Sequence, residues 1–244
     1  NTKAVVVRVE GGLKCVETIN DGNVATICVD QILTGIGRVP AVGGLDLEAA
    51  GVAYDDDAGV QADDFLRTPN RRIYAAGDVC LEHQFTDTAD ASARIVVRNA
   101  LLLGRSRVSA LTIPWCTYTD PEIAHVGLYV RQARERGIPV KTYTVPMHEV
   151  DRAIADGEEH GFVKLHVRDG TDRILGATVV ARHAGEMING ISLAMVAGIG
   201  LRTVAQVIHT YPTQANAIRM AANAYMASRR SPWLRWLLRR WVSR

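Results

Sequence analysis

The sequence predicts an α+β protein on the basis of three observations. Short β-rich runs open the chain, separated by turns rich in glycine and asparagine. An alanine-rich helical pattern lies in the middle, and a second group of β-rich runs precedes two further helical patterns. With 244 residues, of which 48% are hydrophobic, the chain is long enough for one large domain or two small ones.

The first three β-rich runs, at 3–9, 13–18 and 24–29, predict an antiparallel meander. Gly11-Gly12 and the segment 20–23 (NDGN) provide the tight turns between them. The run from Asp30 to Thr34 is expected to be a buried strand, and a turn containing Gly37 and Arg38 ends it. A small strand at 59–62 and a turn at 68–70 follow.

The run 73–78 brings Gly77 and Asp78 together shortly before the helical pattern that opens at Ala89. Glycine allows close approach to the backbone, and an aspartate can accept hydrogen bonds from a ribose or ribityl hydroxyl. The start of a helix nearby would carry a partial positive charge suited to the electron-rich edge of a flavin or to an anion. We interpret the segment as a nucleotide or flavin contact, with an ordinary Gly-Asp turn as the alternative.

A domain boundary is expected near 112–114, followed by a self-contained α+β unit. A helix at 129–136 ends at Gly137, and strands are predicted at 140–146, 161–168 and 174–180. Helices are then predicted at 184–197 and 213–227.

The cysteines and histidines predict no metal site. Cys15, Cys28, Cys80 and Cys116 match neither a redox pair nor a zinc site, so each is expected to be a small buried side chain. The histidines apart from His209 form no i, i+4 pair. Neither a signal peptide nor a membrane-spanning run is visible, and the cytoplasm is the expected compartment.

The segment 229–244 carries three tryptophans and six arginines. Without these six charges, the formal net charge of +2 becomes about −4, so nothing in the remainder indicates nucleic-acid binding. As a helix, the segment would place its tryptophans and leucines on one face. That pattern predicts either peripheral contact with an anionic membrane surface at the inner face or packing on another protein surface.

Six motifs in order give the chain a resemblance to the pyridine nucleotide-disulfide oxidoreductases, especially the mercuric reductase-like and dihydrolipoamide dehydrogenase-like flavoproteins. They are 32–40 (ILTGIGRVP), 44–52 (GLDLEAAGV), 74–78 (YAAGD), 84–86 (QFT), 118–127 (YTDPEIAHVG) and 209–213 (HTYPT). The resemblance covers residues 1 to about 227.

This resemblance implies remnants of NAD(P)H- and FAD-binding α/β domains followed by an α+β dimerisation domain. The implied divisions are 1–43 for the NAD(P)H part, 44–112 for the FAD part, 113–228 for dimerisation and 229–244 for the tail. The implied cofactors are FAD and NAD(P)H. The implied cofactor contacts are Gly77, Asp78, Gln84, Phe85, Thr86, Gly37 and Arg38.

The family's two Gly-x-Gly-x-x-Gly loops and its Cys-x-x-x-x-Cys pair have no counterpart in this sequence. Gly35-x-Gly37 and Gly198-x-Gly200 lack the third glycine. We therefore expect the chain to correspond to the C-terminal half of a longer enzyme and to be inactive in isolation.

Tyr211 and His209 are the candidate catalytic residues. Tyr211 stands where related reductases carry a histidine, and Asn216 stands where they carry its glutamate partner. A phenol, with a reference pKa of about 10, is a poor base at neutral pH but can donate a hydrogen bond. His209 could act as the base only if its loop turned inward, and a structural role is the alternative. Asp87, where a histidine commonly follows Phe-Thr, is expected to cap the helix or to tune the flavin.

The resemblance implies a homodimer that passes electrons from NAD(P)H through FAD to a small-molecule acceptor, either a disulfide or a metal ion. Mercuric reductases share the tyrosine, but this chain has no cysteine after Cys116 to match their C-terminal pair. The alternatives are a non-catalytic dimerisation module and an NAD(P)H oxidase or quinone reductase of the same architecture.

Overall fold

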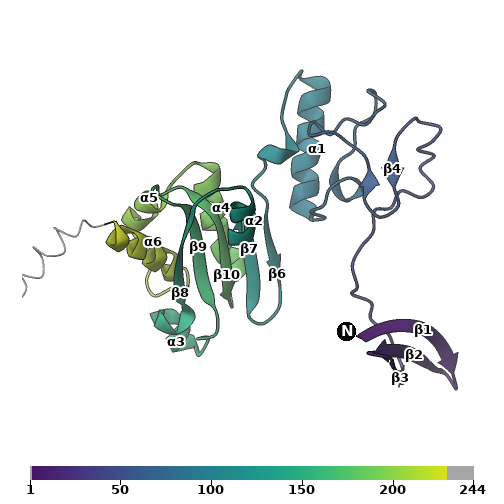
Figure 1. Cartoon of the computed structure of the whole chain (residues 1–244), viewed down its shortest axis with the longest axis horizontal. Coiled ribbons are helices and arrows are strands. Elements are labelled where there is room, and N and C mark those ends of the chain that lie inside the picture. Colours follow the sequence, from purple (N-terminus) through teal and green to yellow (C-terminus); the bar gives the residue numbers. More distant parts are fainter. Residues whose placement is uncertain (1, 230–244) are drawn as a thin grey trace, which may run out of the picture. The chain divides into compact units, whose positions relative to one another are not determined.

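The computed structural model describes residues 2–229, and the chain divides after Leu103 into two units (Figure 1). Unit 1 contains a three-stranded sheet, a two-stranded sheet and one long helix. Unit 2 contains a five-stranded sheet with helices. The predicted α+β class is confirmed. The expectations for the tail after Arg229 concern residues outside the described range.

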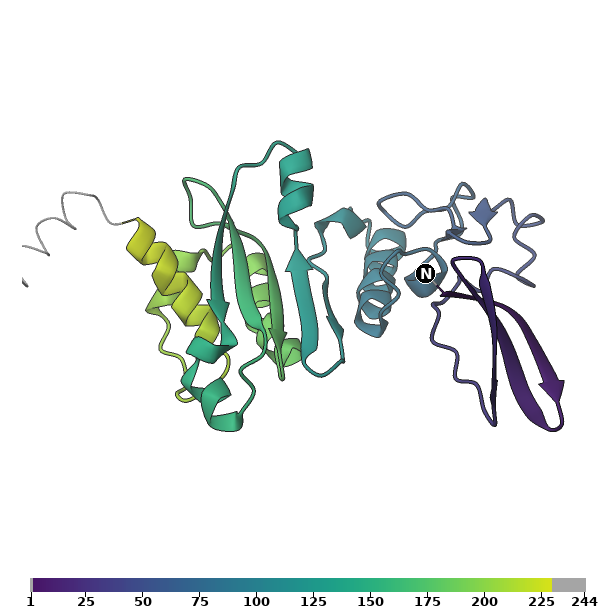
Figure 2. The same cartoon turned by 60° about the horizontal axis from the view of Figure 1, so that its bottom comes forward.

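The predicted meander is confirmed as β1 (Thr2–Glu10), β2 (Leu13–Asn20) and β3 (Asn23–Val29), which form an antiparallel sheet in that order (Figure 2). Asn20 pairs with Asn23, so Asp21 and Gly22 form a two-residue turn. Both have positive φ, 47° and 85°, as a type I′ hairpin turn requires. An irregularity between Ala4 and Val6 shifts the register of β1 against β2.

Cys15 and Cys28 form a disulfide between β2 and β3, so the expectation of four isolated buried cysteines was wrong for this pair. The hairpin register places the two residues directly opposite each other, with their Cα atoms 4.0 Å apart. Cys15 is buried and Cys28 is exposed. Cys80 and Cys116 are free and half-buried.

The predicted buried strand from Asp30 to Thr34 was wrong, because these residues are exposed and irregular. A strand is stabilised by hydrogen bonds to a neighbour, and no strand in the described part of the chain pairs with this segment. The predicted small strand at 59–62 is confirmed in part as β5 (Gly59–Val60), which pairs with β4 (Tyr54–Asp55).

The run 73–78 is β-rich in sequence but does not form a strand. Within it, Tyr74 forms an isolated bridge with Arg67, and the chain then enters a 3₁₀ turn, η1 (Gly77–Val79). The predicted helix is present as α1 (Thr86–Leu101), which begins three residues before Ala89. Asp87 therefore lies inside its first turn and does not cap it; Phe85 is the N-cap residue.

The sheet of unit 2 is antiparallel throughout, in the order β6-β7-β10-β9-β8. Its strands are β6 (Pro114–Thr117), β7 (Glu122–Gly127), β8 (Val140–Pro146), β9 (Phe162–Arg168) and β10 (Ile174–Ala181). The three predicted strands are confirmed as β8, β9 and β10. Strands β6 and β7 were not predicted.

The helices of unit 2 include the three that were predicted. They are α2 (Val130–Glu135), α3 (Asp151–Asp156), α4 (Ala184–Val196), α5 (Leu201–Gln206) and α6 (Asn216–Ser228), with the 3₁₀ turns η2 (Val108–Ala110) and η3 (Met147–Glu149). Helices α3 and α5 were not predicted, although each has six residues, as the predicted α2 does. Across residues 2–229, no helix combines the length and the apolar character needed to cross a membrane.

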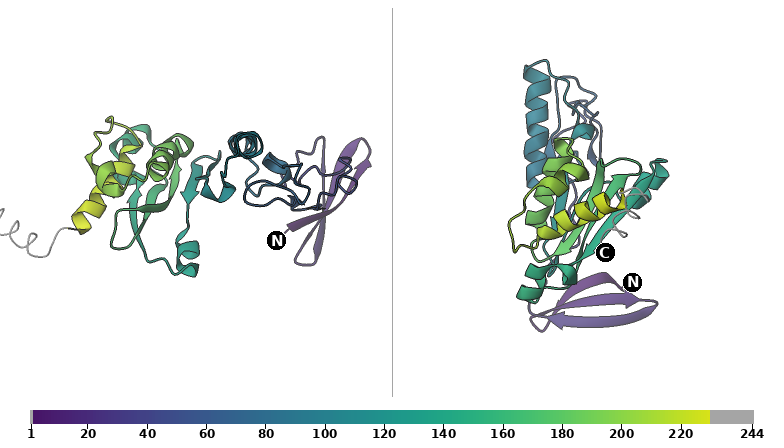
Figure 3. Two further views of the ribbon diagram at one scale, coloured as in Figure 1. Left: turned by 90° about the horizontal axis from the view of Figure 1, so that it is seen from above. Right: turned by 90° about the vertical axis from the view of Figure 1, so that its left-hand side faces the viewer.

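Helices α4 and α6 cover one face of the five-stranded sheet (Figure 3). Alternate residues of β7, β10, β9 and β8 point toward them, as in the cross-strand row Val126, Ala177, Leu165 and Tyr143. Together with Ile191 of α4, these side chains belong to one continuous buried core.

The opposite face of this sheet carries both polar and apolar side chains. His125, Thr178 and Lys164 form one cross-strand row on β7, β10 and β9. His166 lies opposite Thr142 on the neighbouring strand, and their side chains share a hydrogen bond of 2.9 Å. The two faces thus separate an apolar core from a layer that contains two buried histidines.

Candidate functional site

Three of the predicted cofactor contacts, Arg38, Asp78 and Gln84, come together in unit 1. The Arg38 Nη1 lies 3.6 Å from the Asp78 Oδ2, and Arg38 Nη2 also donates to the backbone carbonyl of Gln84. The Gln84 amide in turn donates to the backbone carbonyl of Asp78 at 3.4 Å. The Arg38 and Asp78 side chains are 64% and 45% exposed, so the ion pair is weak and the carboxylate is accessible to a ligand.

Gly77 is held against α1 by its backbone. Its N–H donates to the hydroxyl of Ser92 at 2.9 Å, and that hydroxyl donates to the carbonyl of Ala89 at 2.8 Å. With φ at +75°, Gly77 adopts a conformation that side-chain-bearing residues rarely take, and an added Cβ would lie 3.1 Å from the Ala89 Cβ. The role of Ser92 was not predicted, because its contact with Gly77 joins residues 15 positions apart.

The start of α1 lies next to this cluster in sequence. Phe85 is its N-cap, Thr86 is its first residue, and no side chain caps the first turn. A 16-residue helix has a partial positive charge at this end, and its first N–H groups lack partners within the helix. Gly37, with φ at +117°, directly precedes Arg38 and has open space around its Cα.

These residues fit a flavin dinucleotide. An accessible carboxylate follows a glycine whose backbone is fixed, and an uncapped helix start supplies N–H donors. Asp87 adds a negative charge inside the first turn of the same helix.

Tyr211 of unit 2 donates a hydrogen bond from its hydroxyl to Asp151 Oδ2 at 2.8 Å. This bond and the negative charge of Asp151 raise the pKa of Tyr211. The phenol therefore stays protonated at neutral pH and acts as a donor. Asp151, the first residue of α3, was missed because it lies 60 residues from Tyr211 and in no recognised motif.

His209 lies on the wall of an apolar cavity of about 270 Å³ formed by residues of α4, α5 and α6. Its Nδ1 is 3.1 Å from the carbonyl oxygen of Val207. Asn216, at the position of the family's glutamate, accepts a hydrogen bond from Arg219 at 3.0 Å. The described geometry therefore gives Tyr211 a carboxylate partner, whereas the recorded partner of His209 is a backbone carbonyl.

Within residues 2–229, no group of three or more histidine, cysteine, aspartate or glutamate side chains is arranged to hold a metal ion. Burial raises the pKa of the Cys80 thiol to about 11. Burial and the charge of Glu122 also raise the pKa of Cys116. Both free thiols are therefore poor nucleophiles at neutral pH.

Two family models match the chain. The model "Pyridine nucleotide-disulphide oxidoreductase" matches residues 1–94, and its "dimerisation domain" counterpart matches residues 113–222. The mercuric reductase of Staphylococcus aureus is 38% identical over 202 residues, which cover 83% of this chain and 37% of that protein. The mercuric reductase of Streptomyces lividans is 33% identical, over 91% of this chain and 49% of that protein.

Two solved structures also match most of the chain. LpdA from Mycobacterium tuberculosis matches with a TM-score of 0.82 and 31% identity, over 92% of this chain and 48% of that chain. The HOCl-induced flavoprotein disulfide reductase RclA from Escherichia coli matches with a TM-score of 0.78 and 27% identity, over 91% of this chain and 50% of that chain. The chain thus spans half or less of the length of these relatives.

Proposed function

Because this chain belongs to the pyridine nucleotide-disulphide oxidoreductase family, whose members use FAD and NAD(P)H, we propose that it works in an enzyme that passes electrons from NAD(P)H through FAD to a disulfide or metal-ion acceptor. The 38% identity to a mercuric reductase supports a metal-ion acceptor. We propose a homodimer, in line with the match to the family's dimerisation domain.

The observation that carries this proposal is the cluster of Arg38, Asp78 and Gln84 in unit 1, which also holds the uncapped start of α1. In the proposed role, the Asp78 carboxylate accepts a hydrogen bond from a hydroxyl of the cofactor's sugar-like chain. Arg38 holds that carboxylate in place through the ion pair and donates to the Gln84 backbone carbonyl, and the first N–H groups of α1 would suit an electron-rich ring edge. FAD supplies the two-electron redox chemistry when it is bound.

Tyr211 is proposed to act as a hydrogen-bond donor beside the acceptor and not as a general base. Asp151 raises the pKa of Tyr211, so its proton is retained at neutral pH. A neutral hydrogen-bond donor suits a ligand bound to thiolates, because the thiolates carry negative charge and can accept a hydrogen bond. His209 is proposed to have a structural role, because it lies on an apolar wall and its Nδ1 is close to a backbone carbonyl.

A dimerisation module without a redox activity of its own is the second candidate. The observation that favours it is the continuous buried core of unit 2, which involves residues of the sheet and of α4 and α6. Such a unit could fold and associate without a cofactor.

The two candidates are distinguished by titrating the purified 244-residue chain with FAD and following its visible absorption and its sedimentation. The first candidate predicts saturable FAD binding. Asp78→Ala should weaken it by about tenfold to a hundredfold, since a hydrogen bond to a charged group contributes about 1.5–3 kcal/mol. Asp90→Asn is the matched control, because it removes an exposed carboxylate of α1 that pairs only with Arg94 in the described contacts. A dimer that binds no FAD would contradict a cofactor site formed by this chain alone and would support a dimerisation module that belongs to a longer flavoenzyme.

A further inference from the structure

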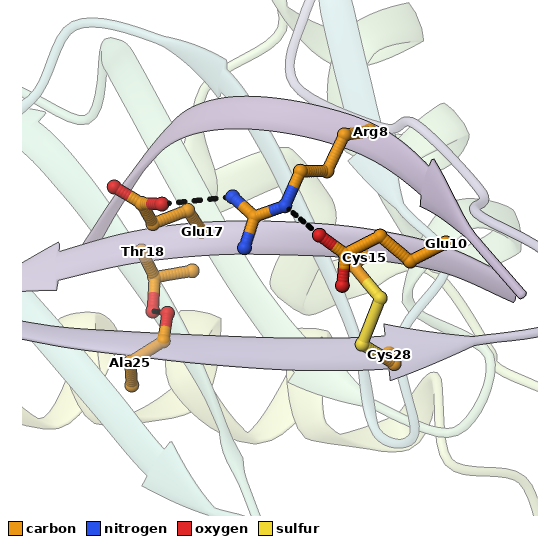
Figure 4. A network of polar contacts seen from close by, with 7 residues as sticks. All are labelled: Arg8, Glu10, Cys15, Glu17, Thr18, Ala25 and Cys28. Carbon is orange, nitrogen blue, oxygen red and sulfur yellow. Dashed lines mark hydrogen bonds and ion pairs between the residues drawn. A yellow bond between two sulfur atoms is a disulfide. The ribbon is translucent and has the colours of Figure 1, made fainter.

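One face of the β1–β3 sheet carries the Cys15–Cys28 disulfide beside a group of charged side chains (Figure 4). Arg8 lies directly across from Cys15 on β1, and Cys28 lies directly across on β3. Arg8 contacts Glu10 at 2.5 Å and Glu17 at 3.0 Å on the same face. We propose that this disulfide is a thiol–disulfide exchange site that takes a small thiol or dithiol as its reductant and is attacked at Cys28.

The two sulfurs differ in accessibility. Cys15 is 1% exposed because it lies on the central strand with neighbours on both sides, whereas Cys28 is exposed. Exchange requires a thiolate to reach one sulfur of the bond, and the partner sulfur then leaves. An external thiol can therefore reach Cys28, and Cys15 is the leaving sulfur.

The sheet topology leaves a path for this attack. Strand β3 is an edge strand, because the order is β1-β2-β3. The disulfide runs from β2 to β3, so a nucleophile in line with the bond and beyond Cys28 approaches from outside the sheet. In the described range, no strand pairs with the outer side of β3.

Both faces of the sheet carry exposed aliphatic side chains. Val7 and Val9, at 59% and 72% exposed, lie on the face opposite the disulfide, and Val6 and Val24, at 44% and 61%, lie on the disulfide face. The disulfide face differs in carrying the ion pairs of Arg8. Burying these charges would be costly, so the part of this face around the disulfide stays accessible.

The hairpin keeps the site reversible. Seven residue pairs join β2 and β3, from Lys14–Val29 to Asn20–Asn23, and their pairing does not require the sulfur bond. After reduction, the two thiols remain opposite each other, so the bond can form again within the hairpin.

The exchange conserves atoms and electrons. A thiolate of the reductant forms a bond to Cys28 Sγ, the Cys15–Cys28 bond breaks, and Cys15 leaves as a thiolate that takes a proton from water. With a dithiol, the second thiol attacks its own sulfur in the mixed disulfide and releases Cys28. The protein gains two electrons and two protons, and the dithiol becomes a cyclic disulfide.

The test uses the folded full chain equilibrated with mixtures of reduced and oxidised dithiothreitol without denaturant. Acid quenching, alkylation and peptide mass spectrometry then measure the redox state of Cys15 and Cys28, with Cys80 and Cys116 as free-thiol references. We expect the pair to shift from fully oxidised to fully reduced as the mixture becomes more reducing, and to reverse when the mixture is reversed. A pair that stays oxidised until denaturant is added would overturn the proposal.

The attacked sulfur is identified with single variants and glutathione disulfide. In Cys15→Ser, the remaining Cys28 should form the mixed disulfide roughly tenfold or more faster than Cys15 does in Cys28→Ser, because accessibility controls the reaction. Circular dichroism checks that both variants are folded. If either is not, the glutathione adduct trapped on the wild-type chain after brief partial reduction gives the same information. Equal rates, or an adduct found mainly on Cys15, would contradict the assigned direction of attack.

Discussion

Acidification should destabilise unit 2 through His166. This histidine is 3% exposed on the face of the sheet opposite α4 and α6, where its Nδ1 shares a hydrogen bond with the Thr142 hydroxyl. Burial, followed by the charges of His125 and Lys164, lowers the pKa of His166 from its ordinary value of 6.5 to about 4. His166 is thus neutral in the folded protein at pH values where the unfolded chain is already protonated.

The direction and size of the effect follow from this difference. Between pH 6.5 and pH 4, the unfolded state binds more protons than the folded state, so the free energy of unfolding falls as the pH falls. From about pH 7 to about pH 5, the loss is about 2 kcal/mol, and it approaches about 3 kcal/mol below pH 4. Burial also lowers the pKa of His125, which adds to the loss in the same direction.

Urea denaturation at several pH values, followed by tryptophan fluorescence, measures this loss. All four tryptophans lie after Leu103, so the signal reports on the C-terminal part of the chain. His166→Gln removes the titrating group and keeps a polar partner for Thr142, so its stability should fall by about 2 kcal/mol less between about pH 7 and pH 5. His160→Gln, at an exposed position, is the matched control and should behave like the wild type.

Equal pH dependence in the wild type and in His166→Gln would refute this reasoning. An NMR titration that finds the pKa of His166 near 6.5 in the folded chain would refute it independently, because it would show that burial does not disfavour the charged ring.

Two further predictions concern the backbone of unit 2 and its candidate catalytic tyrosine. Gly161→Ala should destabilise the chain by about 3 kcal/mol or more in denaturant unfolding, because φ is +119° and the new Cβ would lie 2.0 Å from the carbonyl oxygen of Val180. The control Gly157→Ala, with φ at +69° and open space around the new Cβ, should cost only about 1 kcal/mol. Equal losses of stability in the two variants would contradict the steric argument. Asp151→Asn should lower the pKa of Tyr211 toward its ordinary value, since the substitution removes the negative charge that raises this pKa. Ultraviolet titration of the phenolate measures the change. An unchanged pKa of Tyr211 would show that the hydrogen bond does not form in solution.

The sequence identified most elements of unit 2 because strands such as 140–146 alternate apolar and polar residues, and because the core face of α4 repeats at helical spacing. The prediction from the sequence was wrong where the local residue pattern favours a strand but no neighbouring strand pairs with it. The run from Asp30 to Thr34 is apolar enough for a strand, but strand formation depends on a neighbour that sequence alone cannot provide.

The disulfide could have been predicted from the sequence. The segment NDGN predicted a two-residue turn, and a turn of that length sets the register of the whole hairpin. Five residues outward on each strand from the Asn20–Asn23 pair lie Cys15 and Cys28. By contrast, the contact between Tyr211 and Asp151 joins residues 60 positions apart through the packing of unit 2, and no local pattern encodes it.

The same distinction holds for the candidate cofactor site. Arg38, Asp78 and Gln84 were named through a family resemblance, whereas their mutual contacts and the anchoring of Gly77 by Ser92 came only from the structure. The assignment of these residues to a cofactor stays a prediction.

The unequal cores of the two units have a thermodynamic consequence. The core cluster of unit 1 contains four buried side chains, Val42, Val52, Val60 and Ala75, whereas that of unit 2 extends through a five-stranded sheet and its covering helices. Heating should therefore produce two calorimetric transitions, of which that of unit 1 has the smaller enthalpy, since the enthalpy of unfolding scales with the size of the cooperative unit. The candidate cofactor residues all lie in unit 1, so a bound ligand would raise the midpoint temperature of the transition with the smaller enthalpy by mass action.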